Sequence, residues 1–311
     1  MPNSVYSGYN KLLSGLSVLY KNHSFVADEI WKPLKVKMAT GNYLKFDKTL
    51  YDITNTMRGT RQESVSADFG WVNDVYALNR HAFSTFVYDD EANEVDGDVD
   101  LSVAAVQFVK EKLLLEQELL AFGPDSPINS TSATNNSGTT TLDLTTPSTA
   151  DWKTPLELGA SSIELAAGVS PNTLIMHPGT MRAIIQTAQF QNSIQYVLPT
   201  LEIGGIMLPT NLLGMPIKYV QAIANTANDG QTVSNSRIMP NNIWMGYIAP
   251  QPMQKFVLTY GARFWNEDQT VVERVLDPMS NKYITNYNWV NKVIAPECGY
   301  LITCTLPSGF N

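Results

Sequence analysis

The acidic run DDEANEVDGDVD is the stretch of this sequence that most resembles a chemical site. Asp96, Asp98 and Asp100 occupy the first three ligand positions of a calcium-binding EF-hand loop. The sixth position, however, is Leu101 where the loop needs glycine, and the twelfth is Gln107 where a bidentate glutamate should close the site. The pattern favours a solvated acidic cluster at the start of a helix, with a weak cation site as the alternative.

Other residues that could do chemistry do not form a recognisable motif. The sequence contains no phosphate-binding glycine loop, no zinc-protease helix motif and no serine-hydrolase elbow. His23, His81 and His177 do not share a ligand spacing, so each is expected to serve local hydrogen bonding. Cys298 and Cys304 fit neither a zinc site nor a disulfide framework, which is typical of a reducing compartment. We expect no catalytic residue, no cofactor, no metal site and no enzyme activity.

Composition argues against two further classes of function. The chain has 311 residues, 44% of them hydrophobic, so it can bury a sizeable core. Its formal net charge of -8 argues against a surface built to neutralise nucleic-acid phosphates. No apolar run reaches the length of about 18 residues that a membrane helix needs, and the leucine-rich start lacks the cleavage site of a signal peptide. We expect a folded protein that binds no membrane.

The clearest element that could position such residues is an amphipathic helix over residues 101–122. Its predicted buried face carries apolar residues at helical spacing, namely Leu101, Ala105, Phe108, Val109, Leu113, Leu115, Leu119 and Phe122. The predicted hydrated side carries polar residues, namely Gln107, Lys110, Glu111 and Glu118. Gly123 and Pro124 supply a stop signal. At about 1.5 Å per residue, the helix would be about 33 Å long.

Before this helix, the sequence predicts a long β-hairpin over roughly residues 34–76. Extended runs such as YLKF precede a turn-rich tip, NTMRGTRQ. In the second strand apolar residues alternate with polar ones, namely Val65, Ala67, Phe69 and Trp71. Residues 9–19 add a short helix with one apolar stripe. Because a two-stranded ribbon buries little surface, both features predict apolar faces that a compact monomer cannot cover.

The rest of the chain mixes helices and strands. Thr154 as N-cap, Pro155 at the first helical position and Glu157 as capping partner predict a helix that runs to about Gly168. PNTLIM then predicts a buried strand and HPGTM a strand-to-helix turn. A third helix has an inner stripe, namely Met181, Ile184, Ile185 and Ala188. Later segments are mostly extended: MPIKYV, NIWMGYI, QKFVLTYG, TVVERVL, KYITNYNWVNKVI and GYLITCTL. The fold class is α+β.

The order of these elements resembles the major capsid protein family of tailed bacteriophages, which has the Hong Kong 97-like fold shared with encapsulins. The stretches that carry the resemblance are ADEIWKPLKVKMATGNYLKFDK, DVDLSVAAVQFVKEKLLLEQELLAF, SPNTLIMHPGTMRAI and NIWMGYIAP. The resemblance covers nearly the whole chain and lies in the order and spacing of these stretches. It implies five segments: an N-arm at 1–33, an extended E-loop hairpin at 34–88, a peripheral domain with a long spine helix at 89–123, an axial domain at 124–269, and the peripheral return strands at 270–311.

The resemblance also implies a structural function. Many copies would self-assemble as hexamers and pentamers into an icosahedral shell around double-stranded DNA, in a virion capsid assembled in the host cytoplasm. Scaffold, portal and decoration proteins would be further partners, and the packaged DNA would be held without sequence-specific binding. The alternatives are an encapsulin-type nanocompartment shell and an enzyme with an unrecognised site.

Candidate subunit-contact residues lie on the predicted hairpin, namely Arg58, Arg61, Lys45 and Trp71. Arg58 and Arg61 at the turn are candidates for ion pairs between subunits, with ordinary solvated loop charges as the alternative. An apolar projection laid on a neighbour gains about 25 cal/mol for each Å² that it buries, which favours association.

The polar run at residues 129–149, NSTSATNNSGTTTLDLTTPST, needs a source of order. Fixing its backbone costs on the order of 20–40 kcal/mol of conformational entropy, which the few apolar groups, chiefly Leu142 and Leu144, cannot offset alone. We expect the run to cross between the peripheral and axial domains. Backbone hydrogen bonds, some of them from neighbouring subunits, are expected to hold it.

Overall fold

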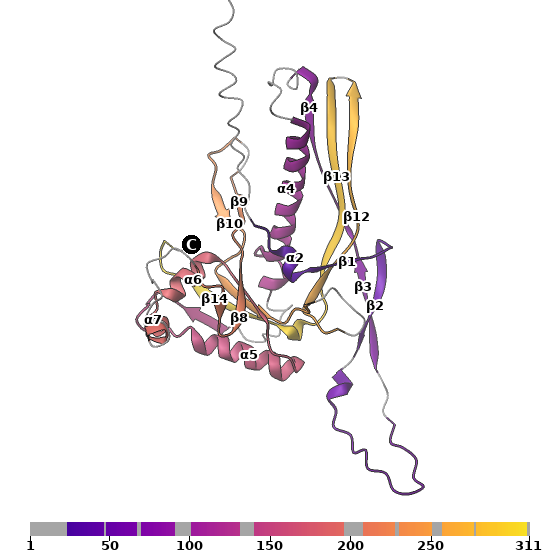
Figure 1. Ribbon diagram of the computed structural model, residues 1–311, viewed down its shortest axis with the longest axis vertical. Coiled ribbons are helices and arrows are strands. Elements are labelled where there is room, and N and C mark those ends of the chain that lie inside the picture. Colours follow the sequence, from indigo (N-terminus) through magenta and orange to yellow (C-terminus); the bar gives the residue numbers. More distant parts are fainter. Residues whose placement is uncertain are drawn as a thin grey trace, which may run out of the picture.

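The computed structural model describes residues 24–46, 48–66, 70–90, 101–130, 140–195, 208–227, 230–250, 257–276 and 278–309. The helix predicted at 9–19 and residues 91–100 of the acidic run lie outside these ranges. Within them the fold is mixed α+β, as predicted. An elongated part with α4 and long strands stands above a broader part with a second sheet and several helices (Figure 1).

Helix α4, Leu101–Phe122, has the predicted bounds. The side-chain amide of Asn129 donates to the carbonyl oxygens of Phe122 and Gly123 at 2.6 and 2.9 Å, and so satisfies acceptors at the helix end. The amide of Asn242 in turn donates to Asn129 Oδ1 at 3.0 Å. This chain of bonds ties the end of α4 to strand β11, Asn242–Gly246.

The buried face of α4 differs from the predicted one. Phe108 and Leu119, predicted to be buried, are each 44% exposed. Glu118, predicted to face solvent, is 0% exposed, and Gln117 beside it is buried as well. The short helix α2, Ala27–Ile30, covers the side that carries Glu118, while the long strands pack on another side. A helix end that is surrounded in this way has no single apolar stripe for the sequence to reveal.

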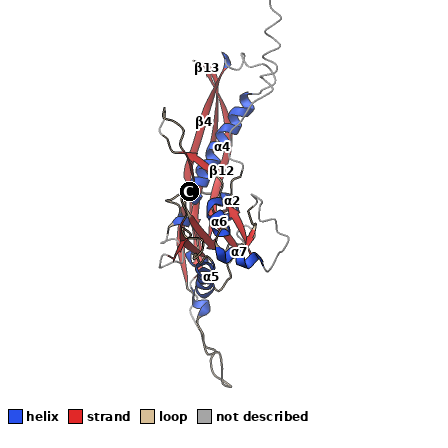
Figure 2. Cartoon of the chain, turned by 90° about the vertical axis from the view of Figure 1, so that its left-hand side faces the viewer, coloured by secondary structure: helices blue, strands red, loops and turns tan. Residues whose placement is uncertain are grey.

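A four-stranded sheet lies along α4, in the order β1–β12–β13–β4. Its strands are β1 Lys32–Lys35, β4 Asn79–Tyr88, β12 Gly261–Leu276 and β13 Met279–Val293. β12 and β13 form a long antiparallel ribbon, β4 pairs antiparallel with β13, and β1 runs parallel to the start of β12. Figure 2 shows α4 running beside these strands in the second view too. Val87, Ala105 and Tyr283 form a small core between helix and sheet.

The broader part contains a six-stranded sheet in the order β5–β14–β11–β6–β8–β7. The strands not yet given are β5 Thr140–Asp143, β6 Thr173–Met176, β7 Asn211–Leu212, β8 Met215–Tyr219 and β14 Gly299–Thr305. A separate small ribbon pairs β9 Ile223–Asn225 with β10 Asn235–Arg237. The helices here are α5 Lys153–Ala167, α6 Pro178–Ile185 and α7 Ala188–Gln195. A buried apolar cluster that includes Leu156, Met176, Met181 and Ile243 joins helices and sheet.

Two helix predictions need correction. Helix α5 begins at Lys153, and the carboxylate of Asp151 accepts the N–H groups of Lys153 and Thr154, each at 3.2 Å, so Thr154 is not the N-cap. Glu157 pairs with Lys153 instead of closing a capping box. Gly168 ends the helix at a φ of 67°, as predicted. The predicted third helix is two helices, because the chain turns between α6 and α7.

The predicted hairpin is also too long. β2, Thr40–Phe46, pairs antiparallel with β3, Trp71–Ala77. β1 belongs to the ribbon sheet, and Val65 lies in a loop rather than in the second strand. A sequence pattern can predict that a segment is extended, but it does not specify which strand the segment pairs with. The prediction therefore placed β1 in the hairpin, although β1 pairs with β12.

The polar run is held in part by the six-stranded sheet. β5 pairs in parallel with β14, and the side chains of Leu142 and Leu144 are buried. The N–H of Leu144 donates to the carbonyl of Thr305 at 2.9 Å. Backbone hydrogen bonds thus hold residues 140–144, as predicted, but their partner is the same chain. Residues 131–139 lie outside the described ranges, and contacts with neighbouring subunits stay a prediction.

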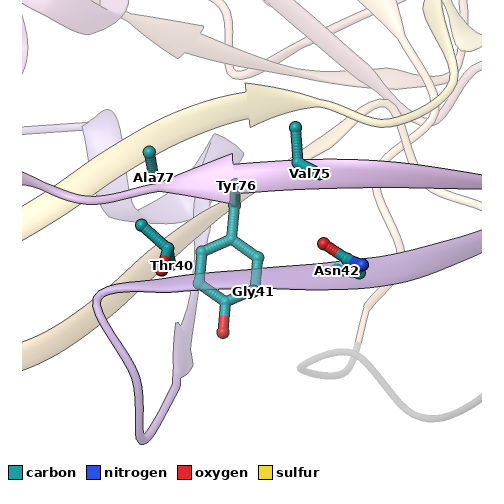
Figure 3. Close-up of a pocket in the computed structure, with 6 residues that line it drawn as sticks. All are labelled: Thr40, Gly41, Asn42, Val75, Tyr76 and Ala77. Atoms are coloured by element: carbon teal, nitrogen blue, oxygen red, sulfur yellow. The ribbon is translucent and has the colours of Figure 1, made fainter.

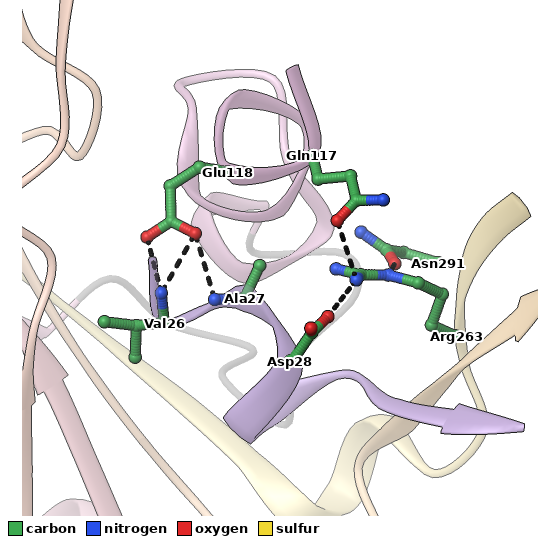
Figure 4. A network of polar contacts seen from close by, with 7 residues as sticks. All are labelled: Val26, Ala27, Asp28, Gln117, Glu118, Arg263 and Asn291. Atoms are coloured by element: carbon green, nitrogen blue, oxygen red, sulfur yellow. Dashed lines mark hydrogen bonds and ion pairs between the residues drawn. The ribbon is translucent and has the colours of Figure 1, made fainter. Parts of the chain in front are cut away.

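A buried polar network joins α2, α4 and the ribbon (Figure 4). Arg263 of β12 is fully buried, and its guanidinium donates to Asn291 Oδ1 at 3.0 Å, to Gln117 Oε1 at 3.1 Å and to the carboxylate of Asp28. The same group lies 5.2 Å from the ring centroid of Trp289. A buried cation requires such partners, so Arg263 fixes the positions of all three elements.

Replacing Arg263 with methionine is expected to lower the free energy of unfolding by about 2 kcal/mol or more, because Gln117 and Asn291 lose their buried partner. The matched control is Arg274→Met on the same strand, where the half-exposed side chain pairs with Asp89. The control should change stability much less. Urea unfolding followed by tryptophan fluorescence measures both, and equal losses would contradict the role of Arg263.

Candidate functional site

The hairpin formed by β2 and β3 carries or adjoins all four predicted contact residues. Figure 1 shows it beside the lower end of the ribbon, with its loop descending past the rest of the molecule. We call residues 48–66 the hairpin loop. This part of the chain is the candidate functional site because it projects from the body. Its attachment and its exposed side chains decide what it can do.

Aromatic stacking fixes the root of the hairpin. The ring of Tyr76 stacks on Phe264 of β12, with centroids 4.7 Å apart and planes 3° from parallel, and Tyr43 lies 5.7 Å from the same ring. Figure 3 shows the Tyr76 ring lying across Gly41 of the neighbouring strand. A Cβ atom on residue 41 would stand 2.5 Å from the Tyr76 hydroxyl oxygen, so the close approach requires glycine.

The surface around this contact is hollowed, and its lining residues are Thr40, Gly41, Asn42, Val75, Tyr76 and Ala77 (Figure 3). The lining carries no carboxylate, amine or imidazole. Its chemistry suits packing against another apolar or aromatic surface.

A polar contact adds to the aromatic one. The Tyr43 hydroxyl donates to Asp74 Oδ2 at 2.6 Å, and Lys292 Nζ of β13 lies 3.3 Å from Asp74 Oδ1. The hydrogen bond from Tyr43 is the largest influence on Asp74 and, with the Val75 N–H and Lys292, holds the pKa of its carboxyl below the ordinary value against the effect of burial. Burial and the neighbouring Asp74 raise the pKa of Tyr43. The carboxylate therefore links both strands of the hairpin to the ribbon.

The start of the hairpin loop is tied to the broader part. The 3-10 turn η1, Lys48–Tyr51, places the Tyr51 hydroxyl 2.8 Å from the carbonyl oxygen of Ala167 at the end of α5. Lys48 Nζ lies 3.1 Å from Glu297 Oε1 in the turn η4, Pro296–Cys298. Burial raises the pKa of Glu297, but its own backbone N–H and the charges of Lys48 and Lys45 outweigh burial and lower it. Two contacts thus set the direction in which the loop leaves the body.

Beyond these ties the hairpin exposes large apolar side chains. Ile53, Met57 and Val65 of the loop have exposed fractions of 103%, 87% and 58%. The strands expose four more, namely Leu44, Trp71, Val72 and Val75. Single exposed apolar residues are common, but a concentration of them on one projection marks an interaction surface.

The four predicted contact residues are not brought together. Arg58 and Arg61 lie in the exposed loop, Arg61 with a φ of 75°, and no ion pair joins either of them to a residue that the structure describes. Trp71 is exposed at the start of β3. Lys45 lies near Glu297 of the same chain, where its charge helps to lower the carboxyl pKa. Their role as contacts between subunits stays a prediction.

Sequence reasoning missed the residues that hold the hairpin. Tyr43, Tyr76 and Asp74 act through their register with one another and with the ribbon, which only the pairing of strands reveals. Tyr51 sits next to the turn-rich tip, and its partner is a backbone oxygen far along the chain. The sequence signal that could have indicated these contacts is the presence of aromatic residues in both strands, namely Tyr43, Phe46, Trp71 and Tyr76.

The sequence candidates for chemistry that the structure describes include His177, Cys298 and Cys304. His177 accepts the N–H of Thr180 at 3.1 Å and caps α6, which confirms the predicted strand-to-helix turn. Cys298 and Cys304 are free and buried, and burial raises the pKa of the Cys298 thiol to about 12. Among the described residues, no cluster of His, Cys, Asp or Glu could hold a metal ion. None of the helices described is long and apolar enough to cross a membrane.

Solved structures of phage proteins are similar to this fold. A phage-related protein from Bordetella bronchiseptica RB50 gives a TM-score of 0.66 at 18% identity, covering 97% of this chain and 98% of that chain. The capsid structure of the cyanophage P-SCSP1u gives a TM-score of 0.62 at 10% identity, covering 94% of this chain and 90% of that chain. This chain therefore has a capsid-like fold.

An encapsulin is similar as well. The holo-SrpI encapsulin complex from Synechococcus elongatus PCC 7942 gives a TM-score of 0.56 at 8% identity, covering 97% of this chain and 96% of that chain. No family model and no curated protein sequence matches the chain. At these low identities the likeness establishes the fold alone, and the function has to be argued from the geometry.

Replacing Gly41 with alanine is expected to loosen the root of the hairpin, because the Tyr76 ring must move from its stack on Phe264. An aromatic pair contributes about 0.5–1.5 kcal/mol beyond its buried area, so hydrogen exchange at residues 40–46 should accelerate by up to roughly tenfold.

The control is the double variant Gly41→Ala/Tyr76→Ala, which should exchange no faster than Tyr76→Ala alone, because the steric conflict is gone. Unchanged exchange in Gly41→Ala, or additive losses in the double variant, would contradict this account of the root.

Proposed function

We propose that this chain is the major capsid protein of a tailed bacteriophage, which self-assembles as hexamers and pentamers into an icosahedral shell around a double-stranded DNA genome. The observation that carries the proposal is the projecting hairpin, whose apolar side chains are exposed in the single chain. The likeness of nearly the whole chain to a phage capsid structure supports it.

The proposed architecture is the Hong Kong 97-like one. Residues 1–33 form the N-arm, 34–88 the E-loop, 89–123 the peripheral domain with its spine helix α4, and 124–269 the axial domain. Residues 270–311 return to the peripheral domain, except that β14 pairs inside the six-stranded sheet and belongs with the axial domain in this scheme. β12 crosses the proposed boundary at 269 as one strand, with a bulge between Trp265 and Glu267.

Burial of the hairpin loop on a neighbouring subunit supplies the driving force. Covering a side chain such as Ile53 or Met57 contributes about 1.5–3 kcal/mol. Association normally loses part of such a gain to the ordering of a flexible segment. Here the contacts of Lys48 and Tyr51 already direct the loop, so less entropy remains to be lost. A shell repeats the contact in every subunit, which multiplies a modest gain.

Charge then sets the choice and register of neighbours. Arg58 and Arg61 leave the loop as exposed cations, and a chain with a formal net charge of -8 offers carboxylates on the adjacent copy. Lys45 and Trp71, nearer the root, are proposed to meet the same neighbour. Exposed pairs contribute little to affinity, so these residues orient the contact more than they tighten it.

The acidic composition also fits the content of the shell. A lumen with few cations does not grip packaged DNA and binds no particular sequence. In this function the chain is a structural protein and not an enzyme. Scaffold, portal and decoration proteins are its proposed further partners, and assembly is proposed to take place in the host cytoplasm before the capsid becomes part of the virion.

The second candidate function is the shell of an encapsulin-type nanocompartment, which the likeness to the Synechococcus complex favours. Both functions require closed shells. They differ in what the shell encloses, which is DNA in one case and protein cargo in the other.

Electron microscopy and content analysis of particles from cells that make the chain naturally would test both functions. Closed icosahedral shells with nuclease-resistant double-stranded DNA are expected. Shells that contain a protein cargo and no DNA would support the nanocompartment instead. Subunits that never close into shells under any solution condition would contradict both proposals.

Replacing Ile53 with aspartate is expected to abolish or strongly reduce shell formation, because a charge would have to be buried at the contact. The melting temperature of the single subunit should stay the same, since the side chain is fully exposed there. The conservative variant Ile53→Leu should form shells like the parent. Normal shells from Ile53→Asp, counted by electron microscopy, would show that the loop is not at a subunit contact.

A further inference from the structure

Glu118 of α4 is a buried carboxyl group that holds a neighbouring segment by its backbone. Its Oε1 and Oε2 accept the N–H of Val26 at 3.0 and 3.1 Å, and Oε2 also accepts the N–H of Ala27 at 2.9 Å (Figure 4). These two amides stand at the start of α2. One side chain of α4 thus holds the backbone of residues 24–31, which we call the entry segment.

The surroundings of this contact are largely apolar. Val26, Ala27, Ile30 and Trp31 of the entry segment are buried in one cluster with the last turn of α4. Removing an ionised carboxyl group from water into such surroundings is costly unless its partners compensate. Backbone amides compensate in part, and a neutral carboxyl group can still accept from them through its carbonyl oxygen.

Charged groups near Glu118 have opposite effects on the ionisation of its carboxyl group. Arg263 from β12 favours the ionised form of Glu118, whereas Asp28 from α2 disfavours it. Arg263 also donates to Asp28, so part of its charge is already compensated. Other charged groups on the elements packed here form three separate pairs, namely Glu29–Lys218, His81–Glu116 and Lys292–Asp74. Further charged groups are Lys110, Glu111 and Lys112, more than one turn before Glu118 on α4, and Lys32 and Lys35 on β1.

Burial is the largest of these influences and raises the pKa of Glu118 to about 7, against the opposing effect of the Val26 and Ala27 amides and of Arg263. A glutamate exposed by opening of the entry segment would return to its ordinary value of 4.5. Docking therefore takes up a proton between these two values. The docked state gains stability as the pH falls from 7 towards 4.5, and it loses that gain as the pH rises through 7.

We propose that Glu118 is a proton-controlled latch for the entry segment, which is held firmly on α4 while this carboxyl group is neutral and loosens when it ionises. The entry segment continues directly into β1 and then into the hairpin. Its looseness would thus change how β1 and the hairpin root are held. The latch does not depend on shell formation and operates in the single subunit.

Hydrogen exchange of the full chain at pH 5.5 and pH 8 would test the latch, after correction for the intrinsic exchange rate. Protection of residues 24–31 is expected to fall by on the order of tenfold or more at the higher pH. Glu118→Gln, a neutral side chain of the same shape, should keep this protection at both pH values. The matched control is Glu116→Gln, on the same helix but partly exposed, which should keep the wild-type pH dependence.

Either of two exchange results would overturn the latch: equal protection of the wild-type segment at both pH values, or a pH dependence that survives in Glu118→Gln. Carbon-13 NMR of labelled glutamate gives a second test that does not rely on the variant being well folded. One side-chain carboxyl resonance of the wild type should titrate near neutral pH. Titration of every glutamate resonance near its ordinary value would contradict the proposal.

Discussion

Two successive residues of β12 face opposite sides of the ribbon and hold its two attachments. Arg263 points towards α4 and α2, where it joins Gln117 and Asp28, and Phe264 points the other way and receives Tyr76 of the hairpin. Opposite orientation of neighbouring side chains is a property of every strand. Here it places the buried guanidinium of Arg263 on one side of the strand and the ring of Phe264 on the other. The entry segment and the hairpin are thus oriented by the same stretch of backbone.

The hairpin itself has only its root in contact with this support. A two-stranded hairpin has no further layer of structure over its loop. The loop side chains Ile53, Met57 and Val65 therefore stay exposed in the single chain. The ties at Lys48 and Tyr51 give the loop a direction and leave those side chains exposed. A directed, apolar and exposed loop is suited to a neighbour of fixed geometry, which a repeating shell provides.

Local signals predicted much of the fold. The glycine–proline pair after Phe122 and the glycine at 168 end α4 and α5 where the sequence indicates. Long-range pairing was beyond those signals. Contacts between distant parts of the chain bury Glu118, pair β1 with β12 of the ribbon and pair β14 with β5 in the second sheet. Within the candidate site, the turn-rich pattern NTMRGTRQ predicted a tip that carries Arg58 and Arg61, and both are exposed. The contacts that hold the hairpin depend on strand register, which no local pattern contains.

The central claim is that the exposed hairpin is completed by other copies of this chain. Sedimentation velocity of the purified chain over a wide concentration range tests it most directly. The account predicts a shift from single subunits to large, closed assemblies as the concentration rises, with the loop at residues 48–66 protected from hydrogen exchange only in the assemblies. A single species of monomer mass at every concentration, under solvent conditions that vary salt and pH, would contradict it.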